Sequence, residues 1–131
     1  MFAESVTVVK GPLAGDERRP EASPIDLEHL ARYTLGDRDL QREIFGLFRD
    51  QLDGSLARLA DAPDVAAWRM AAHTLKGSAR GVGAFRVGAA AEAAERVWTI
   101  GPRARHTRRI AVVLRELDCA ARDVRAFIAT Y

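Results

Sequence analysis

The chain has 131 residues, of which 48% are hydrophobic, and its 20 basic and 18 acidic residues leave a formal net charge of +2. This length suits one domain with its own core rather than two, and so small a charge excess does not by itself indicate nucleic-acid binding. The single cysteine excludes an intrachain disulfide. No apolar run approaches the roughly 18 residues that span a membrane, and the N-terminus lacks a signal-peptide pattern. We therefore expect a cytoplasmic protein.

The first region, residues 1–24, carries two glycines and three prolines, which interrupt any periodicity. We expect it to be a flexible N-terminal arm, followed by a helical bundle over residues 25–131. From Ile25 the chain reads as a short helix with Asp26 and Glu28 in its first turn, ending near Leu35.

A longer helix is predicted next, with Asp37 as its N-cap. Apolar residues follow at i, i+3 and i+4 spacing over several turns, which is typical of a helix with one buried face. These residues are Leu40, Ile44, Phe45, Leu47, Phe48, Leu52, Leu56 and Leu59.

The third predicted helix has Pro63 in its first turn and runs to the break at Gly81–Gly83. At about 100° per residue, one side of it forms a buried seam. That seam consists of Trp68, Ala71, Leu75, Ser78 and Val82. The opposite side is centred on His73 and carries Arg69, Lys76, Gly77, Arg80 and Ala84.

Two more helices complete the pattern. The fourth is expected over about residues 84–100, with Val87, Ala91, Ala94 and Trp98 on one face. After Gly101 and Pro102 the fifth covers about residues 103–130, and we expect Cys119 to be a small core or boundary residue there. Its inward positions are Ile110, Leu114, Leu117, Ala121, Val124 and Ile128. The sequence therefore predicts an all-α fold, an antiparallel up-down four-helix bundle with a short extra N-terminal helix.

The exposed side of the third helix has residues suited to phosphoryl chemistry. Histidine titrates near neutrality, so an exposed imidazole offers a nucleophilic nitrogen at cellular pH. Lys76 lies three residues after His73 on the same helix face and could contact phosphoryl oxygens. Arg80 and Arg69 extend the positive surface. Gly77 at i+4 leaves space beside the ring at a cost of about 1 kcal/mol in helix propensity. Ser78 points more inward than outward.

The run His73-Thr74-Leu75-Lys76-Gly77-Ser78-Ala79, followed by Gly83-Ala84, resembles the signature of histidine-containing phosphotransfer (HPt) domains. The similarity in pattern extends over about residues 25–130. The resemblance implies a carrier without catalytic turnover of its own, which shuttles a phosphoryl group between receiver-domain aspartates in a phosphorelay. By this match His73 accepts the phosphoryl group, Lys76 stabilises it, and Gly77 opens access to it. Arg80 departs from the small or polar residues common in the family at this point, but its place on the same face would let it help to stabilise the group. Arg69, Ser78 and Ala84 would complete the access and docking surface.

The resemblance also implies partners and cofactors. The partners would be receiver domains of response regulators and hybrid histidine kinases, with no nucleic acid or membrane involved. We expect a monomer without a cofactor or metal site of its own, and the Mg²⁺ for aspartyl phosphate chemistry would sit in the receiver. His29 and His106 lack ligand-like neighbours at i+3 and i+4, so both are expected to be surface or boundary residues rather than zinc ligands.

Three alternative functions compete with the carrier. A binding-only helical module could occupy a partner's docking surface without phosphorylation of His73. A nucleic-acid-binding bundle could use basic patches, including the arginines of residues 103–109, although acidic residues are interleaved with them. A kinase dimerisation domain also presents a histidine on a helical hairpin, but it normally accompanies an ATP-binding domain, for which 131 residues leave no room.

Overall fold

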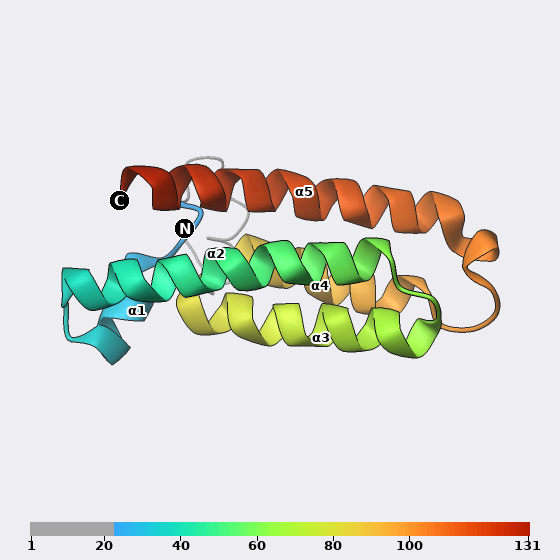
Figure 1. The fold of residues 1–131 in the computed structure, drawn as a ribbon, viewed down its shortest axis with the longest axis horizontal. Helices are drawn as coiled ribbons and strands as arrows, with labels where there is room; N and C mark the ends of the chain where they lie inside the picture. The colour runs from blue at the N-terminus through green and yellow to red at the C-terminus, as the bar shows by residue number, and fades with distance from the viewer. Residues whose placement is uncertain (1–22) are drawn as a thin grey trace, which may run out of the picture.

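The computed structural model describes residues 23–131, which form five α-helices and one short 3-10 turn and contain no β-strand (Figure 1). The elements are α1 (Leu27–Thr34), α2 (Arg38–Ala60), α3 (Val65–Val82), α4 (Phe85–Val97), the 3-10 turn η2 (Arg103–His106) and α5 (Thr107–Thr130). Helices α2 to α5 run up and down along the long axis, and α1 lies at one end (Figure 1). The predicted all-α bundle with a short extra helix is confirmed.

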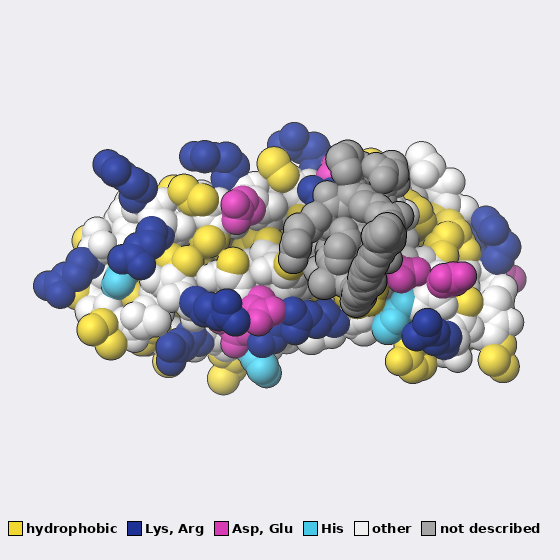
Figure 2. Space-filling model, turned by 180° about the vertical axis from the view of Figure 1, so that it is seen from behind, with side chains coloured by type: hydrophobic (Ala, Val, Ile, Leu, Met, Phe, Trp, Pro, Cys, Tyr) yellow, Lys and Arg dark blue, Asp and Glu magenta, His cyan; other side chains and the backbone are white. Residues whose placement is uncertain are grey.

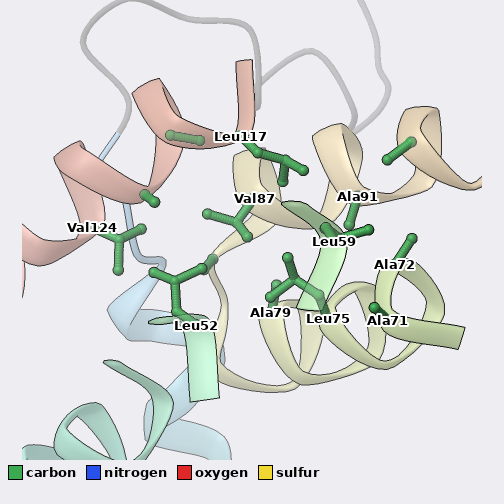
Figure 3. Packing of buried hydrophobic residues seen from close by; sticks show 14 of the residues in the cluster. Leu52, Leu59, Ala71, Ala72, Leu75, Ala79, Val87, Ala91, Leu117 and Val124 are labelled. Carbon is green, nitrogen blue, oxygen red and sulfur yellow. The ribbon is translucent and has the colours of Figure 1, made fainter. Parts of the chain in front are cut away.

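Each long helix packs against its neighbours in the chain, and α5 closes the bundle by packing against α2 as well as α4. The α3–α4 hairpin is the most tightly packed pair, which fits its many alanines, because small side chains let two helix backbones approach closely. Ala72 and Ala79 of α3 and Ala91 of α4 are fully buried in this hairpin (Figure 3). The indole Nε1 of Trp68 donates a hydrogen bond to the Ala94 carbonyl at 2.7 Å, which fixes the register of the two helices.

The larger core side chains come from all four long helices and are fully buried (Figure 3). They include Phe45, Phe48, Leu52, Leu59, Trp68, Leu75, Val87, Leu117 and Val124. The predicted inward positions of α4, and the assignment of both tryptophans to the core, are confirmed. On α2, however, Leu47 is 65% exposed and Leu40 39% exposed, because they lie about a third of a turn from the centre of the buried stripe.

Aspartates cap three of the helices. The side chains of Asp26, Asp37 and Asp64 each accept a hydrogen bond from the backbone N–H three residues further on. The predicted N-cap at Asp37 is confirmed. The prediction for Pro63 was wrong, because Asp64 is the cap of α3 and Pro63 precedes it.

Gly83 ends α3 and also anchors α1. It adopts a left-handed conformation with φ of 88°, and its carbonyl accepts a 2.9 Å hydrogen bond from the backbone N–H of Asp26. A Cβ atom at this position would lie 2.8 Å from the Asp26 carbonyl oxygen. Only glycine fits this turn without displacing the start of α1.

The connection from α4 to α5 differs from the prediction. Helix α4 ends at Val97 rather than near Ile100, and Trp98 is extended yet only 2% exposed. Its Nε1 donates a 2.9 Å hydrogen bond to the Gly101 carbonyl in the non-helical segment that follows. The next residues form the η2 turn before α5 begins at Thr107.

His106 and Cys119 departed from expectation, and Arg103 lies over aromatic rings rather than in an open basic patch. His106 is 8% exposed rather than on the surface, with Nε2 2.6 Å from the Ile100 carbonyl oxygen. Arg103 is half-buried over the rings of Trp68 and Trp98, and it donates to two carbonyls near the end of α2. Cys119 is exposed, because it lies on the outer side of α5.

Residues 1–22 lie outside the described part of the chain, so the flexible arm proposed for residues 1–24 stays a prediction. Of that region the structure describes only Ser23 and Pro24, where the Ser23 hydroxyl donates to the Ile25 carbonyl at 2.7 Å. Within residues 23–131 no helix has both the length and the apolarity to cross a bilayer.

Candidate functional site

His73 lies in the middle of α3 with its side chain 71% exposed. Its predecessor Ala72 and the nearby Leu75 are fully buried, so the seam that anchors the helix also holds the imidazole outward. The predicted placement of His73 on the face opposite the core is confirmed. The site is therefore a surface site on a rigid helix rather than a cleft.

The ring is oriented by a residue of α4. Nδ1 of His73 lies 3.1 Å from Oε2 of Glu95, and the other carboxylate oxygen lies 2.6 Å from Nζ of Lys76. Antiparallel packing of α3 and α4 brings the three side chains together across 22 residues of sequence. Lys76 and Glu95 are 21% and 23% exposed, so this ion pair is more protected from water than the imidazole.

The electrostatics of this triad indicate which nitrogen can react. The hydrogen bond from Lys76 lowers the pKa of Glu95, partial burial opposes it, and the hydrogen bond with His73 lowers it further. Glu95 is then an ionised carboxylate at neutral pH, which can only accept hydrogen bonds. In a neutral ring Nδ1 must carry the proton, and Nε2 keeps its lone pair on the exposed side.

A second charge cluster lies further along the hairpin. Arg80 pairs with Glu92, which also accepts a 2.8 Å hydrogen bond from Arg96. The hydrogen bond and charge of Arg80 are the main causes that lower the pKa of Glu92. The stem of Arg80 crosses Gly88, where a Cβ would lie 3.0 Å from its Cγ. The structure therefore connects Arg80 to α4 and does not bring it into contact with His73.

Basic and acidic side chains are mixed on the surface. Figure 2 shows Lys and Arg groups lying beside Asp and Glu groups on the face opposite to that of Figure 1. Besides the pairs above, Arg86 binds Asp123 and Arg125 binds Asp53, at 2.8 Å and 2.6 Å. This pairing of charges contrasts with the uniformly positive surface that binds a phosphate backbone.

The other predicted site residues have different environments. Gly77 is exposed, and no atom lies within 4 Å of the position that its Cβ would take, so the surface beside the imidazole is bare. Arg69 is exposed and lines a shallow depression together with Lys76 and Glu95. Ser78 is half-buried, as its inward direction predicted.

The predicted position of Ala84 was wrong. Ala84 is fully buried, so a docking partner cannot reach it. The projection at 100° per residue is valid only while the helix continues, and the left-handed Gly83 ends α3 one residue earlier. Ala84 is instead the N-cap residue of α4.

Glu92 and Glu95 were not identified from the sequence. A signal was present, because two acids three residues apart on one helix face the basic pair Lys76 and Arg80 on the preceding antiparallel helix. Recognising it requires the register of the hairpin, which the Trp68–Ala94 bond sets. In the described chain no three His, Cys, Asp or Glu side chains form a group that could hold a metal ion.

Comparison with known proteins identifies a family but no individual relative. The family model described as "Hpt domain" matches residues 43–126, a range that contains His73 and both helices of its hairpin. No curated protein and no solved structure matches the chain.

Proposed function

The chain belongs to the Hpt domain family, whose members transfer phosphoryl groups on histidine in phosphorelays, and on that premise we propose that His73 carries the phosphoryl group between receiver-domain aspartates. Hpt domains are carriers rather than catalysts. The observation that supports the assignment is the exposed His73 with Nδ1 engaged by Glu95 and Nε2 left to react. Neither His29, which is half-buried, nor the buried His106 offers a comparable ring.

The proposed step is a displacement at phosphorus. The Nε2 lone pair attacks the phosphorus of an aspartyl phosphate, a P–N bond forms, and the bond from phosphorus to the carboxylate oxygen breaks. The aspartate leaves with the electron pair as a carboxylate. The ring becomes a positively charged phosphoimidazolium, whose Nδ1–H remains hydrogen-bonded to the ionised Glu95. That carboxylate stabilises the charge that develops on the ring.

We assign different roles to the nearby cations. Lys76 shares Glu95 with His73, and a modest rotation of its flexible side chain brings its ammonium group to the phosphoryl oxygens. Arg69, one turn before His73, is the exposed guanidinium on the same side. Arg80 is engaged by Glu92, so its contribution to the phosphoryl group requires that pair to open.

The remaining features of the proposal concern the partner and the compartment. The partner would be the receiver domain of a response regulator or hybrid histidine kinase, and its own carboxylates would hold the Mg²⁺ that aspartyl phosphate chemistry needs. We further propose that the protein is a monomer, because one copy of the bundle buries its own apolar seam. We also propose that it is cytoplasmic.

The test is phosphotransfer profiling against the receiver domains of the source organism, with His73→Gln as the control. We expect a phosphorylated receiver to label the wild-type chain with an acid-labile, base-stable adduct and to leave the variant unlabelled. Labelling that survives the substitution would contradict the assignment of His73. Equal binding of a receiver to wild type and His73→Ala, without any transfer, would favour the binding-only module.

A further inference from the structure

Glu92 is a second carboxylate on the α4 side of the site, and it binds two guanidinium groups at once. Its Oε1 pairs with Arg80 of α3, and its Oε2 accepts a 2.8 Å hydrogen bond from Arg96, one turn further along α4. We call these three residues the Glu92 cluster. Glu92 precedes Glu95 by three residues, so both acids lie on the same side of α4. Glu95 contacts the imidazole, whereas Glu92 is engaged by arginines.

The Glu92 cluster borders the phosphoacceptor site. Glu92 and Arg96 line the same shallow depression as Lys76 and Glu95, and Glu95 lies 3.1 Å from the ring of His73. The positive charge of Lys76 is one of the causes that lower the pKa of Glu92. The charge of Glu92 is therefore close enough to act on groups at the phosphoacceptor site.

The two guanidinium groups are held by the carboxylate rather than by burial. The side chains of Arg80 and Arg96 are 45% and 75% exposed. Arginine stays charged at all cellular pH values, and its guanidinium has N–H donors to spare for a second anion. Glu92 is ionised at neutral pH, because the hydrogen bond and charge of Arg80 lower its pKa. The ion pairs are therefore the main restraint on where these two cations lie.

Phosphorylation of His73 changes the charge balance at this surface. A phosphoryl group brings about two negative charges and several strong acceptor oxygens. Glu92 repels such a group, and it also occupies two cations that would otherwise bind it. Both effects have the same sign, because each raises the free energy of the phosphorylated chain relative to the unphosphorylated one.

We propose that Glu92 is a positioning residue that keeps the guanidinium groups of Arg80 and Arg96 away from the phosphoryl group, so that phosphorylated His73 gives the group up readily. This inference rests on the proposed function. In the step concerned, a carboxylate oxygen of the receiver's aspartate attacks phosphorus, the P–N bond breaks, and its electron pair returns to Nε2. Each cation that binds the phosphoryl group on the histidine shifts this equilibrium away from the receiver.

The experiment measures how a phosphoryl group is shared between the chain and a receiver. The chain is phosphorylated with phosphoramidate, a small donor that needs no docking surface, and is mixed with an equal amount of the receiver that exchanges fastest with it, in the presence of Mg²⁺. The ratio of phosphorylated chain to phosphorylated receiver is then measured at equilibrium. We expect Glu92→Gln to raise this ratio about fivefold, because one negative charge is removed and two cations are released.

Two controls isolate the released cations. Asp123→Asn makes the same change in net charge and releases Arg86 of α4, but this pair joins α4 to α5. Its ratio should stay within about twofold of wild type, since distant exposed charges are screened. In a chain that carries Arg80→Gln and Arg96→Gln, adding Glu92→Gln should also change the ratio by less than about twofold, because no guanidinium is left to release.

The possible results separate the two proposals. A ratio in Glu92→Gln at or below the wild-type value would overturn the role of Glu92 while leaving His73 as the carrier. A fivefold rise that also occurs in Asp123→Asn, or that persists without the two arginines, would overturn it too. A wild-type chain that phosphoramidate does not label at His73 would instead overturn the proposed function itself. Circular dichroism melts of all variants report whether the bundle is intact.

Discussion

Glu95 binds His73 through one ring nitrogen only, with its Oε2 3.1 Å from Nδ1, and it belongs to the helix that follows α3 rather than to α3 itself. The imidazole is therefore oriented from outside its own helix. Because the second carboxylate oxygen pairs with Lys76, movement of that lysine toward a phosphoryl group leaves Glu95 free to compensate the charge on the ring. One carboxylate thus connects His73 to its nearest cation, Lys76.

The first prediction concerns this carboxylate. In Glu95→Ala the Nδ1–H loses its acceptor, so we expect the neutral ring to shift toward the tautomer with the proton on Nε2, where it blocks attack. A hydrogen bond to a charged group contributes about 1.5–3 kcal/mol, so phosphorylation of His73 by phosphoramidate should slow about ten- to hundredfold. Imidazole ¹⁵N chemical shifts measure the tautomer, and the labelling rate measures the reaction.

Glu95→Gln separates orientation from charge in the same measurement. Its amide oxygen can still accept from Nδ1–H, so we expect the wild-type tautomer but a rate between those of wild type and Glu95→Ala. If all three proteins show the same ¹⁵N pattern and the same rate, Glu95 has no positioning role.

The lowered pKa of Glu95 leads to a prediction about stability and pH. Because its pKa lies below the usual value of 4.5 in the folded chain, the ion pair stabilises the fold at neutral pH and is lost as the pH falls below 4.5. We expect Glu95→Gln to be less stable than wild type at pH 7 by at most about 1 kcal/mol, as for other solvent-exposed pairs. Urea unfolding should show this difference at pH 7 and its progressive loss as the pH falls below 4.5. A difference that persists at low pH would have a cause other than the carboxylate charge.

Two turns, one between α1 and α2 and one between α3 and α4, allow a matched pair of glycine substitutions. Gly36 and Gly83 both have positive φ angles, 78° and 88°, but only at Gly83 does a Cβ collide with another segment, the Asp26 carbonyl. We expect Gly36→Ala to cost about 1–2 kcal/mol from the left-handed conformation alone. Gly83→Ala should cost at least about 1 kcal/mol more, because α1 must move. Equal losses in urea unfolding would show that the contact with Asp26 contributes nothing.

The exposed side of α3 could be predicted because periodicity alone decides which side of a helix is buried. The projection placed His73, Lys76 and Gly77 correctly, and its error at Ala84 lies one residue beyond the left-handed Gly83. Glu95 was not predicted, because its contact depends on how two helices align. The sequence around His73 has no local pattern that predicts how α3 and α4 align.

The sequence was also insufficient to predict the structure around the two tryptophans at one end of the bundle. Trp98 was correctly assigned to the core, but helical spacing did not reveal that α4 ends at Val97, directly before it. Arg103 reads as a solvated charge in the sequence, yet its guanidinium lies over two indole rings and donates to carbonyls of Leu59 and Ala62. Long side chains with a polar tip bury their stems wherever the packing offers acceptors, and the packing is a tertiary property.

Gly77 permits a test of whether open space beside the imidazole matters for function rather than for folding. No atom lies within 4 Å of its missing Cβ, so Gly77→Ala should fit and stabilise α3 by about 0.5–1 kcal/mol through helix propensity. Gly46 in α2 is the control, since its Cβ position is equally unobstructed and lies on a different helix. We expect both variants to be more stable than wild type in urea unfolding.

Only Gly77→Ala should affect transfer, because the added methyl group lies one turn from the imidazole and holds a docked receiver away from Nε2. A displacement of about 1 Å can cost a hundredfold in rate, so we expect receiver-driven labelling to slow about ten- to hundredfold, while phosphoramidate labelling changes little. Gly46→Ala should transfer like wild type with either donor. If Gly77→Ala is stabilised and still transfers at the wild-type rate, the glycine is not required for access to His73. Receiver docking would then not explain why a residue of low helix propensity stands at this position.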